Sequence, residues 1–151
     1  VQGDEPLIVP EAIDDVVAAL DHRRADVMAT LRRRIDDPAD FADPGVVKLV
    51  VDAQGYAIYF SRAAIPFVRP GLTPPTAWRH MGLYVYRREF LRELAALAPT
   101  PLEQAEGLEQ LRALEHGFRI ATVETTVHTV GVDTPEDLER VRRLVEAGAR
   151  P

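Results

Sequence analysis

The sequence predicts an α/β domain whose sheet is mostly parallel and flanked by helices, with a β-hairpin and a proline-rich loop as excursions. Segments with the period of about 3.6 residues that marks an amphipathic helix alternate with short β-rich runs along the chain. The chain has 151 residues and 46% of them are hydrophobic, which suits one domain with a substantial core. We therefore expect residues 1–151 to form a single domain.

The composition argues against several classes of protein. The chain contains no cysteine, which excludes disulfide frameworks, thiolate zinc sites and iron–sulfur clusters. No apolar run approaches the roughly 18 residues that a membrane helix needs, and no signal-peptide pattern opens the chain. The 18 basic and 24 acidic residues give a net charge of -6, which argues against a nucleic-acid surface. We expect a cytoplasmic protein that binds neither a membrane nor nucleic acid.

The first half of the chain predicts a helix, a strand and a hairpin. Pro10 suits a first helical turn, and the apolar residues Ile13, Val16 and Leu20 follow it at helical spacing. A helix is therefore expected over residues 10–22. Strands are expected at residues 26–31, 46–52 and 56–60, with a polar turn at 36–38 and a hairpin turn at 53–55.

The second half predicts a long loop followed by alternating strands and helices. Residues 61–78 hold four of the 12 prolines, and loops of such length are usually functional or part of an interface. Thr100 opens a capping box and a leucine stripe continues to Gly117, so one helix is expected there. The other elements are strands at 79–86, 118–123 and 127–132, a helix at 89–97, and a last helix opened by Thr134 with Leu138, Val141 and Val145 facing the core.

Two acidic residues lie where an α/β sheet usually collects its ligands. Asp4 precedes the first helix and Asp133 precedes the last one, both at the expected carboxyl ends of strands. Magnesium is commonly held by one or two carboxylates together with substrate phosphates, so this pair could bind Mg²⁺. An acid at such a position also complements the helix dipole, which is the structural alternative for each residue.

The predicted strand at 79–86 carries a polar face. Alternation places Met81, Leu83 and Val85 on the core side. The other side presents His80, Gly82, Tyr84 and Tyr86 in order. An imidazole and two phenols with a glycine gap between them would leave room for a polar ligand. The alternative is a half-exposed strand with a hydrogen-bonded histidine.

Charged and amide side chains near this strand are further candidates. Arg62 ends a strand and Arg69 follows in the proline-rich loop, and a guanidinium can bind both oxygens of a carboxylate or phosphate. On the predicted helix, Glu106, Glu109 and Gln110 lie three and four residues apart and could bind sugar hydroxyls. Solvation at the surface is the alternative for all five side chains.

Several motifs together resemble one enzyme family. They are residues 1–6 (VQGDEP), 59–62 (YFSR) with 65–66 (IP), 79–86 (RHMGLYVY), 101–104 (PLEQ) with 108–112 (LEQLR), and 131–139 (GVDTPEDLE). In this order and spacing, across nearly the whole chain, they resemble the 3-deoxy-manno-octulosonate (Kdo) cytidylyltransferases, also called CMP-Kdo synthetases. The resemblance implies a Rossmann-like nucleotidyltransferase sheet.

The resemblance also implies a reaction and a site. In the family, the anomeric hydroxyl of Kdo attacks the α-phosphate of CTP, which gives CMP-Kdo and diphosphate for lipopolysaccharide synthesis. By position, Asp4 and Asp133 would be the Mg²⁺ ligands and the catalytic pair. The Kdo-binding set would be Gln2, Arg62, His80, Tyr84, Glu109 and Gln110. A homodimer is implied as well, with residues 46–86 near the sugar site and the dimer interface.

The sequence departs from the family at Ala64 and Phe67 in the proline-rich loop, where proline and tyrosine or tryptophan are more typical, and on the nucleotide side of the site. Family members place a triphosphate-binding loop rich in Gly, Arg and Lys before the turn that matches residues 1–6, and this chain has no such loop and only one lysine, Lys48. Because Val1 falls at a strand-to-helix junction, we expect that sequence is missing upstream. The complete protein would then be the enzyme, and this chain alone would be inactive. The alternative is a non-catalytic remnant that binds a sugar acid or a partner.

Overall fold

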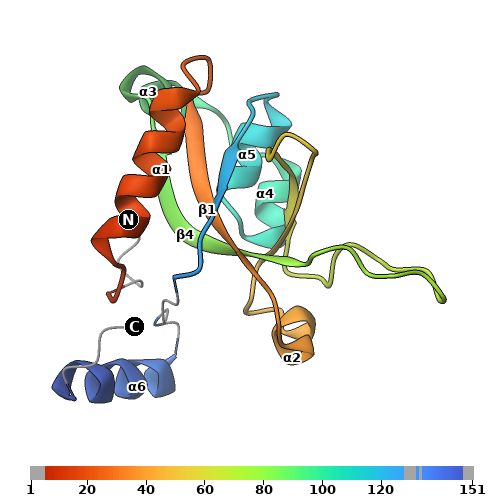
Figure 1. Cartoon of the computed structure of the whole chain (residues 1–151). Coiled ribbons are helices and arrows are strands. Elements are labelled where there is room, and N and C mark those ends of the chain that lie inside the picture. Colours follow the sequence, from red (N-terminus) through yellow and green to blue (C-terminus); the bar gives the residue numbers. More distant parts are fainter. Residues whose placement is uncertain (1–5, 128–131, 133, 148–151) are drawn as a thin grey trace.

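A five-stranded sheet organises the chain (Figure 1). The computed structural model describes residues 6–127, 132 and 134–147. In spatial order the strands are β3 (Ala57–Ser61), β2 (Lys48–Val51), β4 (Trp78–Tyr86), β1 (Met28–Arg34) and β5 (Ala121–Glu124). β1 and β5 are parallel, whereas the other pairings are antiparallel. The α/β class is confirmed, and the sheet is mixed rather than mostly parallel.

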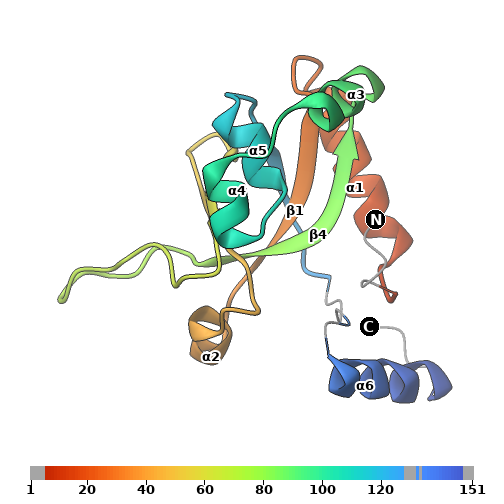
Figure 2. The same ribbon diagram turned by 180° about the vertical axis from the view of Figure 1, so that it is seen from behind.

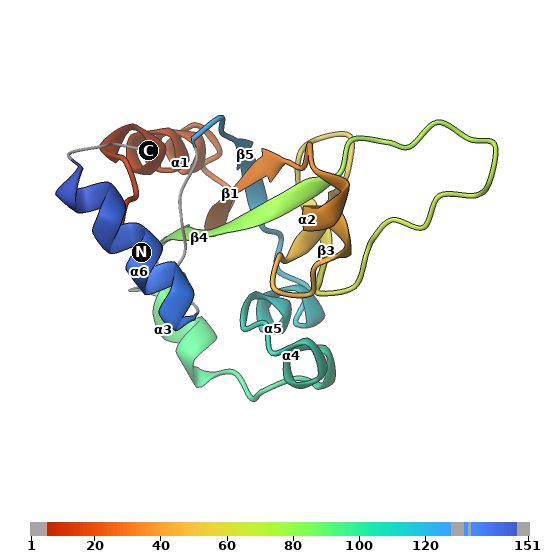
Figure 3. The same cartoon turned by 90° about the horizontal axis from the view of Figure 1, so that it is seen from below.

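Helices cover the two faces of the sheet separately. The helices of the described chain are α1 (Pro10–His22), α2 (Pro38–Ala42), α3 (Arg88–Ala96), α4 (Pro101–Glu106), α5 (Gln110–Glu115) and α6 (Pro135–Glu146), and not all of them lie on the sheet. On one face, Val16 and Leu20 of α1 pack in a cluster with Met81 and Leu83 of β4. α4 and α5 lie over the opposite face (Figure 3), above a second cluster that contains Phe60, Phe90, Leu108, Leu111 and Ile120. The alternation predicted for the central strand is therefore confirmed.

The helix predicted at residues 10–22 is confirmed as α1, but the helix predicted from Thr100 to Gly117 is not continuous. Gly107 adopts a left-handed conformation with φ of 64°, which ends α4, and α5 begins only at Gln110. A residue with a side chain is disfavoured in this conformation, so glycine suits the break. The predicted leucine stripe does not form one buried face, because Leu102 on α4 is 42% exposed whereas Leu108 and Leu111 are buried.

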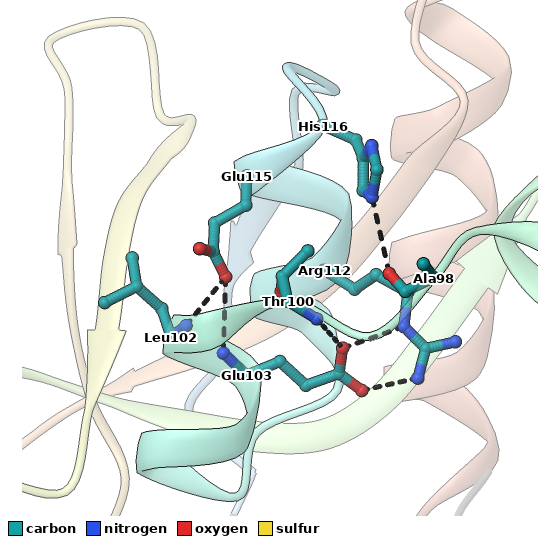
Figure 4. Close-up of polar contacts among 7 residues, drawn as sticks. All are labelled: Ala98, Thr100, Leu102, Glu103, Arg112, Glu115 and His116. Atoms are coloured by element: carbon teal, nitrogen blue, oxygen red, sulfur yellow. Dashed lines mark hydrogen bonds and ion pairs between the residues drawn. The ribbon is translucent and has the colours of Figure 1, made fainter.

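Charged side chains hold the two short helices together (Figure 4). Arg112 of α5 donates to both carboxylate oxygens of Glu103 on α4, and this contact holds the pKa of Glu103 below its usual value. Glu115 accepts from the backbone N–H groups of Leu102 and Glu103, at 3.1 and 3.3 Å, in the first turn of α4. These bonds fix the start of α5 relative to α4 and so position Gln110.

Residues 62–77, which we call the arm, contain no helix or strand and extend away from the sheet (Figure 2). The predicted long loop is confirmed. The arm leads from β3 to β4, which run in the same direction because each pairs antiparallel with β2, the strand between them. Phe67 and Leu72 on the arm are 84% and 64% exposed.

Other expectations need correction. The polar segment predicted at 36–38 leads into a short helix that was not predicted, α2, which Asp37 caps by accepting a hydrogen bond from the backbone of Ala39. α6 begins at the predicted capping box, yet of the three residues predicted to face the core only Val141 is buried. Leu138 and Val145 are exposed because α6 lies apart from the sheet in Figures 1 and 2. The strand predicted at 127–132 falls mostly outside the described residues.

Candidate functional site

The polar face of β4 forms a row of rings. His80 and Tyr84 have ring centroids 5.2 Å apart, and Tyr84 and Tyr86 follow at 5.8 Å. Phe60 meets the other side of His80 edge-on at 5.1 Å. Burial, with the charge of Glu109 contributing, raises the pKa of Tyr86 to about 12 and that of Tyr84 well above its usual value. Both phenols therefore stay protonated and able to donate a hydrogen bond.

Two further candidates lie at the start of α5, whose residue Leu111 belongs to the cluster that contacts Tyr84 and Tyr86. Gln110 is 6% exposed, and its Nε2 atom is buried without a hydrogen-bond partner among the described residues. An unpaired buried donor is rare in proteins and marks a position where a ligand can supply the acceptor. Glu109 is exposed, and it is close enough to raise the pKa of both Tyr84 and Tyr86. Surface solvation is therefore wrong for Gln110, because the break before α5 turns it inward.

Within the described residues, two of the three guanidinium nitrogens of Arg62 form hydrogen bonds. Its Nε donates to the carbonyl of Glu106 at 2.9 Å and its Nη1 to that of Pro44 at 3.2 Å. Within the described part of the chain, Nη2 has no partner and no carboxylate pairs with the guanidinium. Its charge therefore remains available to an anionic ligand.

Glu106 has a structural role rather than a place at the surface. Its carboxylate accepts hydrogen bonds from the Ser61 hydroxyl at 2.6 Å, the Tyr59 hydroxyl at 3.3 Å and the Arg62 backbone at 2.9 Å. These contacts tie the end of α4 to the end of β3. Glu106 was expected either to bind a sugar hydroxyl or to be solvated at the surface. Instead, its carboxylate links α4 to β3.

Lys48 is a residue that sequence reasoning left without a role. It is fully buried, and its ammonium donates to three backbone carbonyls, those of Asp43, Val46 and Arg62, at 2.7, 2.6 and 2.6 Å. Burial lowers its pKa, and the three acceptors satisfy all three of its N–H groups. The signal in the sequence was a lone lysine inside an apolar β run. Lys48 supports the backbone of Arg62 instead of reaching towards a phosphate.

His80 contacts the buried Thr30 of β1. Its Nε2 lies 3.0 Å from the Thr30 hydroxyl, which is itself 2.8 Å from the carbonyl oxygen of Leu83. Burial lowers the pKa of His80 from 6.5 to about 3. The ring is therefore neutral near pH 7.

The remaining candidates cannot be placed. Gln2, Asp4 and Asp133 lie outside the described residues. Within residues 6–127, 132 and 134–147, no group of three or more His, Asp and Glu side chains could hold a metal ion. No helix in the same part of the chain is long and apolar enough to cross a membrane. Arg69 lies exposed on the arm.

Comparison with known proteins shows which family the chain belongs to. A family model described as "Cytidylyltransferase" matches residues 1–145. The chain belongs to this family. A protein of Solibacter usitatus named 3-deoxy-manno-octulosonate cytidylyltransferase is 55% identical over 147 residues. A protein of the same name from Geobacter sulfurreducens is 52% identical over 151 residues.

The cytidylyltransferase relatives are longer than this chain. The matched segments cover 97% and 93% of this chain but only 58% and 60% of the two relatives. A solved structure of CMP:2-keto-3-deoxy-manno-octonic acid synthetase complexed with CTP is 40% identical and superposes with a TM-score of 0.89. It covers 98% of this chain, which spans 61% of that protein. The Rossmann-like nucleotidyltransferase fold is confirmed by this match.

We predict that His80 makes stability depend on pH. Its pKa is about 3 in the folded chain, against 6.5 for the ordinary imidazole, so the folded state binds fewer protons between these values. Stability is therefore lost as the pH falls below the higher value, by about 2 kcal/mol between pH 7 and pH 5. Urea titration of the full-length protein along this range measures the loss. His80→Gln should flatten this part of the curve, and an unchanged slope would contradict the prediction.

Proposed function

We propose that this chain supplies the sugar-acid side of a cytidylyltransferase site that converts CTP and Kdo into CMP-Kdo and diphosphate for lipopolysaccharide synthesis. The observation that carries the proposal is the buried, unpartnered amide of Gln110, at the start of the helix that faces the β4 rings. The printed names of the relatives at 55% and 52% identity support it. The solved relative is described as a complex with CTP, which supports the nucleotide.

The side chains around β4 suit a polyhydroxylated acid. Arg62 carries a positive charge with no ion-pair partner in the described structure and would bind the carboxylate of Kdo. His80, Tyr84 and Gln110 are neutral hydrogen-bonding groups for its hydroxyls, and Glu109 adds an acceptor at the exposed edge. A binding site for such a ligand needs one cation and several neutral groups, and this set provides both.

The reaction itself is a transfer between oxygen atoms. The anomeric oxygen of Kdo forms a bond to the α-phosphorus of CTP, the bond from that phosphorus to the diphosphate oxygen breaks, and the hydroxyl proton is released. Such transfers depend on positioning and on neutralisation of charge more than on covalent chemistry by the protein. On this proposal Arg62, His80, Tyr84, Glu109 and Gln110 hold the sugar acid so that its anomeric hydroxyl points towards the nucleotide.

We propose further that Asp4 and Asp133 are the magnesium ligands, with Gln2 beside them on the sugar. Carboxylate oxygens are the donors that Mg²⁺ prefers, so the chemistry of this pair fits the ion. When bound, Mg²⁺ would neutralise phosphate charge and lower the pKa of the attacking hydroxyl. Because nucleoside triphosphates are supplied there, the cytoplasm is the compartment we propose.

A second candidate function is a non-catalytic module that binds a sugar acid. It is favoured by the burial of Lys48, the one lysine of the chain, on backbone carbonyls, which leaves no lysine for a triphosphate. The upstream reading frame separates the two candidates. A Gly-, Arg- and Lys-rich loop encoded before Val1 supports the enzyme, and a stop codon or unrelated sequence supports the module.

We also propose a homodimer, in which the arm contacts a second copy of the chain. Phe67 and Leu72 present apolar side chains to solvent on a segment that extends far from the sheet. Large exposed apolar side chains on one extended segment favour a contact with another protein, and a second copy is the simplest partner.

Tyr84→Phe tests the sugar side of the site. Loss of one hydrogen bond to a buried group costs roughly 1–3 kcal/mol, so the KM for Kdo should rise about ten- to a hundredfold while the KM for CTP stays nearly unchanged. Release of diphosphate by the full-length protein measures both constants. Tyr56→Phe is the matched control, because that hydroxyl donates to Asp26 at 2.8 Å. Equal effects of Tyr84→Phe on both substrates would contradict the proposed pocket.

Asp4→Asn and Asp133→Asn test the metal pair. Each change removes a negative ligand, so turnover in the presence of Mg²⁺ should fall by orders of magnitude while the urea midpoint stays within error. Asp36→Asn, at an exposed ion pair with Arg34, is the control and should keep full turnover. Full activity in both variants would rule out the pair.

Sedimentation equilibrium tests the dimer. At micromolar concentration the full-length protein should sediment with twice the chain mass, and a variant that carries Phe67→Ser and Leu72→Ser should shift towards the monomer, because it removes the exposed apolar groups. Val145→Ser changes an apolar residue that is 59% exposed on α6 and serves as the control. A monomer mass for the unaltered protein would reject the proposal.

A further inference from the structure

A break in the pairing of β1 with β4 lies beside His80. Thr30 pairs with Tyr84, but the next residue, Leu31, pairs with Met81, so the ladder shifts between them. At such a bulge the backbone groups of the longer strand lose their regular partners. A buried carbonyl without a partner is costly, and a side chain must then supply the missing donor.

The hydroxyl of Thr30 supplies that donor. Thr30 is fully buried, and its Oγ1 lies 2.8 Å from the carbonyl oxygen of Leu83 and 3.3 Å from that of Met81. A carbonyl oxygen only accepts, and a hydroxyl carries a single proton. The proton of Thr30 is therefore committed to the β4 carbonyls, and only its lone pairs remain for other groups.

Because the Thr30 proton is already used, the donor and acceptor roles of the two His80 ring nitrogens are determined. Nε2 of His80 lies 3.0 Å from Thr30 Oγ1, and because Thr30 has no second proton, Nε2 must be the donor of that bond. A neutral imidazole carries one N–H group, so its Nδ1 is then an acceptor. Nδ1 has no hydrogen-bond partner among the described residues.

We infer that Thr30 is a positioning residue that holds His80 in the Nε2–H tautomer, so that His80 binds the substrate only by accepting a hydrogen bond from a hydroxyl group at Nδ1. The inference rests on the proposed function for the substrate and on the geometry of the bulge for the tautomer. The pKa of His80, lowered by burial to about 3, is consistent with a ring that does not add a second proton. His80 would then recognise a hydroxyl group of Kdo, whereas Arg62 would bind its carboxylate.

Nitrogen NMR of the full-length protein tests the tautomer directly. Long-range proton–nitrogen spectra of the ¹⁵N-labelled protein, near pH 7, should show His80 with a protonated Nε2 and a bare Nδ1. His80→Gln assigns the signals by their loss. A spectrum with the proton on Nδ1, or on both nitrogens, would overturn the inference, and no variant of Thr30 is needed for this result.

Two variants of Thr30 test its role. Thr30→Val removes the hydroxyl, so His80 should lose its single-tautomer spectrum and the KM for Kdo should rise roughly tenfold, with the KM for CTP unchanged. Thr30→Ser keeps the hydroxyl and should restore both properties. A Thr30→Val protein that keeps the tautomer and the KM would overturn the positioning role.

The outcomes separate this inference from the proposed function. If the full-length protein does not use Kdo, the proposed function fails, whereas the spectra of the unaltered and Thr30→Ser proteins still decide the tautomer. If Thr30→Val does not fold, loss of the Nε2–H spectrum in Thr30→Ser would overturn the role of the hydroxyl. If Kdo is turned over but its binding leaves the Nδ1 signal unshifted, the hydroxyl contact at His80 is wrong.

Discussion

The ammonium group of Lys48 lies fully buried at the start of β2, where a charge without partners would cost several kcal/mol. It is stabilised because three carbonyls, from Asp43, Val46 and Arg62, meet at one point. Because Lys48 needs all three acceptors, the segment before β2 is held against the end of β3. Glu106 then attaches α4 to the same place through Ser61 and the backbone of Arg62. The direction of the Arg62 side chain is a consequence of how this buried charge is satisfied.

A second constraint acts from the opposite end of the site. The break at Gly107 turns what would be one helix into two, and the ion pair of Glu103 with Arg112 locks the second helix against the first. Gln110 is buried at the start of this second helix, and the next residue, Leu111, packs in the cluster that also contacts Tyr84 and Tyr86. The candidate residues thus lie on β4 and at the adjoining ends of β3 and α5, which are held in place by polar contacts within the protein.

Much of the fold follows from local patterns. The helical spacing after Pro10, the capping box before α6 and the alternation along β4 each depend only on neighbouring residues, and the structure confirms them. The motifs also indicated the family, which the match to residues 1–145 confirms. Arg62, His80, Tyr84, Glu109 and Gln110 were chosen from sequence, and the structure places them on β4 and the adjoining ends of β3 and α5. Their contact with Kdo stays a prediction.

By itself, the sequence determined the class of fold, the faces of the central strand and the family, because periodicity and ordered motifs are properties of adjacent residues. It could not show the antiparallel pairing of β4, the burial of Lys48 or the role of Thr30. Each of these depends on partners far away in the chain: the Arg62 carbonyl lies 14 positions from Lys48, and the Leu83 carbonyl lies 53 positions from Thr30. From the sequence alone, a buried polar side chain cannot be told from an exposed one, because its hydrogen-bond acceptors are not known. Only the tertiary structure brings those acceptors together, since they are backbone atoms that carry no signature in the sequence.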